Sequence, residues 1–84
     1  MKEIQMVEVN REFVVSGIAE SLEIEISQLN ITSSSSDFEE WDSLGHISIM
    51  SFLDKNYDEI TERVPDFASA TSVIEIITLL EKFG

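Results

Sequence analysis

The chain has 84 residues, of which 43% are hydrophobic, and this composition predicts a single small domain over residues 1–84. Its 17 acidic and 5 basic residues give a formal net charge of −12, which disfavours nucleic acid and anionic membranes as partners. The chain contains no cysteine, which excludes disulfides and thiolate metal sites, and no stretch has the apolar length of a membrane span. We expect a cytoplasmic, monomeric protein that binds or carries a molecule, because so small a core leaves little room for an enzyme's substrate pocket.

A helix is predicted over about residues 7–22. Its apolar residues recur at steps of three and four, which is typical of one buried helix face: Met6, Val9, Phe13, Val14, Ile18 and Leu22. Residues 23–27 alternate like a strand, but no second strand is available to pair with them, so we expect a long loop. In this loop Ile24 and Leu29 should turn inward, whereas residues 32–37, with four serines, should form a solvated and poorly ordered connector.

A second helix is predicted over residues 43–58. Asp42 is a good N-cap, because its carboxylate can accept hydrogen bonds from the free amides of the first turn. Ile47 and Ser51 fall beside the apolar stripe and should be exposed. The stripe itself, expected to face the core, consists of Leu44, Ile49, Met50, Leu53 and Tyr57.

Two further helical segments are predicted near the C-terminus. Pro65 suits a first helical position, so residues 64–70 should hold a short helix anchored by Phe67. Ser72 and Glu75 match a capping box ahead of an amphipathic helix over residues 73–83. The fold class predicted is therefore all-α, with three longer helices, one short helix and a long first loop.

The second helix begins at a sequence with a known likeness. Trp41, Asp42, Ser43 and Leu44 stand at its start, and Asp42-Ser43-Leu44 resembles the D-S-L attachment motif of the acyl carrier protein family. The order of the predicted elements, the small size and the acidity resemble this family over nearly the whole chain. The resemblance implies a small four-helix bundle of the acyl carrier type. In the other interpretation, Ser43 and Asp42 only begin and cap a helix.

The resemblance also implies a function. A separate phosphopantetheinyl transferase would attach 4′-phosphopantetheine from coenzyme A to the hydroxyl of Ser43, with Asp42 a ligand to magnesium in the transferase complex. A helix N-terminus is favourable for such a phosphate, because its amides are unpaired and it carries partial positive charge. The arm would carry an acyl or aminoacyl thioester to partner enzymes, and the chain itself would be no enzyme.

Partner enzymes in this family meet the helix face beside the modified serine, here Leu44, Ile47 and Ser51, with Glu40 and Asp54 as flanking acids. Housekeeping fatty-acid carriers have several acids along this face. The present chain has none between Ser43 and Leu53, which favours a carrier of a specialised pathway, such as secondary metabolite biosynthesis, over general fatty-acid synthesis.

Trp41 and His46 also resemble residues of carriers from specialised pathways. The simpler interpretation, which we favour, makes Trp41 a loop aromatic that covers the end of the bundle and His46 an exposed helix residue. With one histidine and no cysteine, a catalytic dyad or a zinc site has little support.

Two other functions fit parts of the chain. Asp54, Asn56 and Asp58 alternate as at the start of a calcium-binding EF-hand, but Glu59 replaces the required glycine and Pro65 the final glutamate. The broader alternative is an unmodified acidic helical adaptor that binds basic protein surfaces. An adaptor, however, gives no reason for Asp42-Ser43-Leu44 to stand at a helix start.

Overall fold

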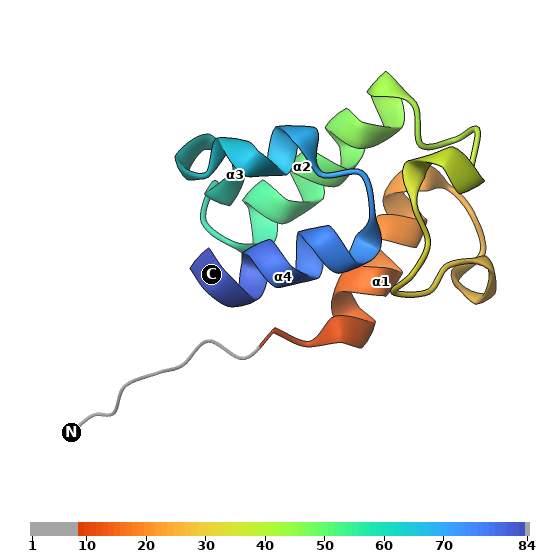
Figure 1. Cartoon of the computed structure of the whole chain (residues 1–84), viewed down its shortest axis with the longest axis horizontal. Coiled ribbons are helices and arrows are strands. Elements are labelled where there is room, and N and C mark those ends of the chain that lie inside the picture. The colour runs from red at the N-terminus through yellow and green to blue at the C-terminus, as the bar shows by residue number, and fades with distance from the viewer. Residues whose placement is uncertain (1–8, 84) are drawn as a thin grey trace.

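The computed structural model describes residues 9–83 and has an all-α fold, as the sequence predicts. Met6, the first residue of the predicted apolar pattern, and Val7, the first residue of the predicted helix, lie outside the described residues. Figure 1 shows the long first connection, residues 23–42, looping out beside one end of α1 and α2. The helices and 3₁₀ turns are α1 (Arg11–Leu22), η1 (Ile26–Gln28), η2 (Ser35–Asp37), α2 (Ser43–Asn56), α3 (Ile60–Arg63), η3 (Pro65–Ser69) and α4 (Val73–Phe83).

Helix α1 begins at Arg11 and not at residue 7, because Asn10 is its N-cap: the Asn10 side chain accepts a hydrogen bond from the Phe13 amide at 3.0 Å. Val14, Ile18 and Leu22 are buried as predicted. Phe13 is exposed, contrary to the prediction, although its ring lies 5.5 Å from that of Phe52. The buried face of α1 is therefore narrower than the spacing of its apolar residues predicts.

The connector over residues 32–37 is more structured than predicted. The Ser35 amide donates to the Thr71 carbonyl at 2.7 Å, and the Val73 amide donates to the Ser33 carbonyl at 3.0 Å. Residues 35–37 form the turn η2, and Ser33 is buried. These hydrogen bonds tie the first connection to the start of α4. As predicted, Leu29 is buried and Ile24 packs against the core.

Helix α2 begins at Ser43, as predicted, but ends at Asn56, two residues early, because Asp58 and Glu59 adopt the left-handed conformation. The sequence did not predict α3, a single turn that buries Ile60. The short helix expected over residues 64–70 is the 3₁₀ turn η3, and its predicted anchor Phe67 is fully buried.

Helix α4 has the predicted bounds and supplies a large share of the core. The Glu75 amide donates to the Ser72 hydroxyl at 3.2 Å, which is one half of the predicted capping box. The Glu75 carboxylate accepts from the Thr71 amide at 2.7 Å, and hydrogen bonds of Thr71 and then of Ser72 lower the pKa of this carboxyl. The buried residues of α4 are Val73, Ile76, Ile77 and Leu80.

Two glycines permit close helix packing. A Cβ atom on Gly17 of α1 would lie 1.9 Å from the end of the Phe52 ring, so α2 packs directly on this position. A Cβ on Gly45 would lie 2.1 Å from the Glu40 carbonyl oxygen, which is backbone. The loop before α2 therefore folds back onto the first turn of that helix, and only glycine fits there.

Candidate functional site

Ser43 is the first residue of α2, and its side chain is exposed. Its hydroxyl makes no hydrogen bond with residues 9–83. Asp42 caps the helix: its Oδ1 accepts from the Gly45 amide at 2.9 Å, and its carbonyl accepts from the His46 amide at 2.8 Å. The cap fixes the direction in which α2 starts, and so it holds the Ser43 hydroxyl at the surface.

The start of α2 is suited to a negatively charged group. Within the described chain, the amides of Ser43 and Leu44 have no hydrogen-bond acceptor, as expected for the first turn of a helix. These amides and the helix dipole place partial positive charge beside the Ser43 hydroxyl. The second carboxylate oxygen of Asp42, Oδ2, has no partner among residues 9–83 and can bind a cation.

An open hollow of about 430 Å³ lies beside Ser43. One wall comes from the loop before α2 and from the first turns of α2, and the opposite wall comes from η3 and the segment that follows it. The sequence did not predict this second wall, because it comes from residues more than twenty positions away. The lining residues are Ser35, Trp41, Asp42, Ser43, His46, Ile47, Ala68, Ala70 and Thr71.

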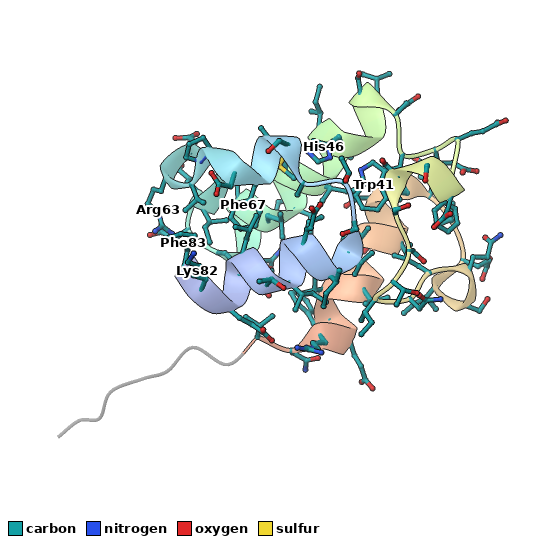
Figure 2. All side chains as sticks on the ribbon, viewed as in Figure 1. Trp41, His46, Arg63, Phe67, Lys82 and Phe83 are labelled. Carbon is teal, nitrogen blue, oxygen red and sulfur yellow. The ribbon has the colours of Figure 1, made fainter. Side chains whose placement is uncertain are left out.

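Three residues connect the two walls of this hollow. The Trp41 indole Nε1 donates to His46 Nδ1 at 3.1 Å, and His46 Nε2 lies 3.1 Å from the Phe67 carbonyl oxygen. Figure 2 shows Trp41 reaching His46 at the start of α2. Trp41 is only 5% exposed, which agrees with its interpretation as the cover of the bundle end. His46 is half-buried, so the prediction of an exposed helix residue was wrong.

The structure brings together only some of the residues of the predicted partner face. Leu44 and Ile47 are 74% and 60% exposed, and Ser51 is exposed on the same side of α2. The prediction that Leu44 faces the core was wrong, because its side chain lies outside the buried face of α2, which Gly45, Ile49 and Leu53 form. Glu40 is exposed just before the helix. Asp54 lies about 16 Å from Ser43 along the helix axis, at the other end of α2.

The half-buried Asp54 has a structural role. Its carboxylate accepts hydrogen bonds from the amide and the hydroxyl of Thr61, each at 2.8 Å. These bonds hold the turn between α2 and α3, so this carboxylate is engaged within the chain rather than directed to a partner. Within residues 9–83, no group of three or more His, Asp or Glu side chains is placed to hold a metal ion.

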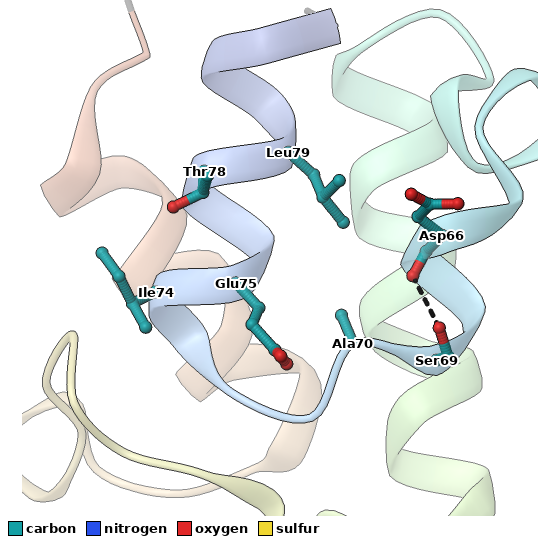
Figure 3. A pocket seen from close by; sticks show the side chains of 7 residues that line it. All are labelled: Asp66, Ser69, Ala70, Ile74, Glu75, Thr78 and Leu79. Carbon is teal, nitrogen blue, oxygen red and sulfur yellow. Dashed lines mark hydrogen bonds between the residues drawn. The ribbon is translucent and has the colours of Figure 1, made fainter.

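A second hollow, of about 360 Å³, lies between η3 and α4. Figure 3 shows Asp66 and Ser69 on one side of it and Glu75 and Leu79 on the other. Ala70 lines both this hollow and the one beside Ser43. The two hollows therefore adjoin at Ala70.

None of the helices within residues 9–83 is both long enough and apolar enough to cross a membrane. Comparisons with protein-family models, with curated proteins and with solved structures gave no match. The candidate site is therefore defined by its own geometry. It consists of an exposed serine at a capped helix start, unpaired amides around it, an adjoining hollow and an exposed apolar pair on the same helix.

Proposed function

We propose that the chain is an acyl carrier protein and that Ser43 carries 4′-phosphopantetheine. One observation carries the proposal: the Ser43 hydroxyl is exposed at the first position of a capped helix, within the sequence Asp42-Ser43-Leu44. An approaching enzyme can reach this hydroxyl. The amides of Ser43 and Leu44 then favour the phosphate that modification leaves behind.

The modification would transfer the phosphopantetheine group from coenzyme A to the Ser43 hydroxyl. The Ser43 oxygen forms a bond to the phosphorus of coenzyme A that bears the pantetheine arm. The pyrophosphate bond of coenzyme A breaks, adenosine 3′,5′-bisphosphate leaves, and the hydroxyl proton passes to a base of the transferase. Asp42 is exposed and its Oδ1 is engaged by the Gly45 amide, so its other carboxylate oxygen would help to hold the magnesium ion, which would neutralise charge on the phosphates.

The reactive group would lie at the end of the arm, outside the core of the chain. A thiol at the end of the arm would hold acyl or aminoacyl cargo as a thioester, at high effective concentration beside a docked enzyme. The hollow beside Ser43 gives the first part of the arm a surface to lie against. The protein is then a substrate of enzymes and performs no bond chemistry itself.

The candidate site favours a partner surface that is partly apolar and partly basic, because it exposes Leu44, Ile47 and Glu40. The two apolar side chains stand on α2, and acids precede them in the loop. An enzyme that docks here would offer an apolar patch bordered by basic residues, since apolar burial supplies affinity and charge steers the encounter. We propose that the partners belong to a specialised pathway, because this helix face lacks the acids of housekeeping fatty-acid carriers.

Intact-mass analysis tests the proposal. The native chain is incubated with coenzyme A, magnesium and a broad-specificity phosphopantetheinyl transferase, beside the variants Ser43→Ala and Ser48→Ala. Ser48 is an exposed serine of the same helix and serves as the matched control. We expect the native chain and Ser48→Ala to gain one phosphopantetheine and Ser43→Ala to gain none.

A known carrier protein in the same mixture confirms that the transferase is active. If the folded native chain gains no mass while that carrier is modified, the Ser43 proposal is wrong. An unmodified acidic adaptor, binding partners through Leu44 and Ile47, would then be the better explanation of the exposed face.

A further inference from the structure

The hydrogen bonds of His46 identify which ring nitrogen donates and which accepts. The Phe67 carbonyl can only accept, so His46 Nε2 must carry a proton, and the Trp41 indole can only donate, so Nδ1 must be bare. Both bonds exist together only in the neutral ring with its proton on Nε2. The two ring planes of Trp41 and His46 lie 18° apart, which is consistent with a bond in the plane of the imidazole.

These two bonds join three separate parts of the chain. Trp41 belongs to the loop before α2, His46 to the second turn of α2, and Phe67 to η3, which is twenty-one residues further on. The same parts form both walls of the hollow beside Ser43. Among residues 9–83, no other hydrogen bond links α2 directly to η3, so His46 is their polar connection.

We propose that His46 is a positioning residue for Ser43: its two ring hydrogen bonds hold the loop before α2 and η3 in the arrangement in which Ser43 is modified. This inference rests on the proposed function of Ser43. Its structural part, the bridge from Trp41 through His46 to η3, can be tested without any modification. His46 touches neither the phosphate nor the reacting oxygen, so it acts through the segments that it holds.

The imidazole suits this bridge because its two ring nitrogens offer one acceptor and one donor on different sides of a flat ring. A leucine at position 46 offers neither an acceptor for the Trp41 indole nor a donor for the Phe67 carbonyl, whereas a glutamine offers both. The two substitutions therefore separate the hydrogen bonds of His46 from the space that its side chain fills.

The chain provides a clean reporter for this bridge, because Trp41 and His46 are its only tryptophan and its only histidine. We would record tryptophan fluorescence and the hydrogen exchange of the indole N–H by NMR in the native chain, His46→Leu and His46→Gln under the same conditions. His46→Leu should show a red-shifted emission and faster indole exchange than the native chain, because the indole loses its acceptor. His46→Gln, which offers an acceptor and a donor, should stay close to the native chain.

The functional part is tested by the rate of phosphopantetheine transfer, measured by mass at saturating coenzyme A. We expect His46→Leu to lower kcat/KM about tenfold, the scale of the hydrogen bonds it removes, and His46→Gln to restore most of the rate. Circular dichroism checks that both variants are folded. Ser48→Ala, on the same helix, should match the native rate.

The outcomes separate the two proposals. If the native chain is modified and His46→Leu is modified equally fast, His46 is no positioning residue. If His46→Leu keeps the native tryptophan emission and the native rate of indole exchange, the bridge itself is wrong. If the native chain accepts no phosphopantetheine, the proposed function fails, whatever the spectroscopy shows about the bridge.

Discussion

Helices α2 and α4 use their apolar residues in different ways. In α4 the four core residues Val73, Ile76, Ile77 and Leu80 are completely buried. In α2 the buried side chains Ile49 and Leu53 share the helix with Leu44 and Ile47, which are mostly exposed. Exposed large apolar side chains that neighbour one another are typical of an interaction surface. Helix α4 therefore mainly supports the fold, whereas the first half of α2 is available to a partner.

The largest expected effect is on stability in α4. Ile77→Ala should lower the free energy of unfolding by about 2–5 kcal/mol, because it leaves a cavity at a fully buried position. Leu44→Ala on α2 should change it by less than about 0.5 kcal/mol. Urea denaturation of both variants measures the contrast. Equal losses at the two positions would show that Leu44 belongs to the core after all.

The next effect concerns the start of α2. Gly45→Ala should destabilise the chain by about 1–3 kcal/mol, although alanine favours helices, because its Cβ would meet the backbone carbonyl of Glu40. Gly17→Ala meets only the end of the Phe52 ring, which can swing aside, so its loss should be smaller. Thermal denaturation compares the two. A more stable Gly45→Ala variant would contradict the close return of the loop onto α2.

Two variants of Asp42 separate its effect on stability from its effect on the modification of Ser43. Asp42→Asn keeps an acceptor for the Gly45 amide, so its free energy of unfolding should stay within about 0.5 kcal/mol of the native value, whereas Asp42→Ala should lose about 1 kcal/mol. Both variants lack the carboxylate and should accept phosphopantetheine at least about tenfold more slowly, a barrier increase of about 1.4 kcal/mol. Normal transfer to Asp42→Asn would argue against a magnesium ligand at this position.

The smallest expected effect is the loss of stability at acidic pH that Glu75 of α4 causes. The Thr71 amide donates to the Glu75 carboxylate and holds its pKa below the ordinary glutamate value of 4.5. A lowered pKa stabilises the fold above the ordinary value, and that contribution is lost as the pH falls through the lowered one. Glu75→Gln should therefore flatten the decline of stability below about pH 4.5. An unchanged decline, followed by urea denaturation at several pH values, would exclude this contribution.

The sequence predicted helices well where local signals agree. Helix α4 has a serine cap and a regular apolar stripe, and its bounds matched the prediction. The start of α2 was equally clear because Asp42 precedes an apolar pattern at once. Leu44 was misplaced because periodicity identifies a stripe but not its edge. In the first turn of α2, Gly45 is buried against the loop and α1, whereas the adjacent Leu44 lies just outside the buried face and is exposed.

Other features depend on contacts that are distant in the sequence. Residues 32–37 look like a flexible serine linker, and only the hydrogen bonds to Thr71 and Val73 give them structure. The turn α3 was too short for a periodic pattern to reveal it. The bridge from Trp41 through His46 to Phe67 joins residues up to twenty-six positions apart, and no local pattern predicts it.

Peptide mapping of the modified chain tests the central claim most directly. After incubation with coenzyme A, magnesium and the transferase, the chain is digested and the phosphopantetheine is located by tandem mass spectrometry. We predict that it lies on Ser43 and on no other serine, including the run of four at residues 33–36. A chain that stays unmodified, or that carries the group on another serine, would contradict the account.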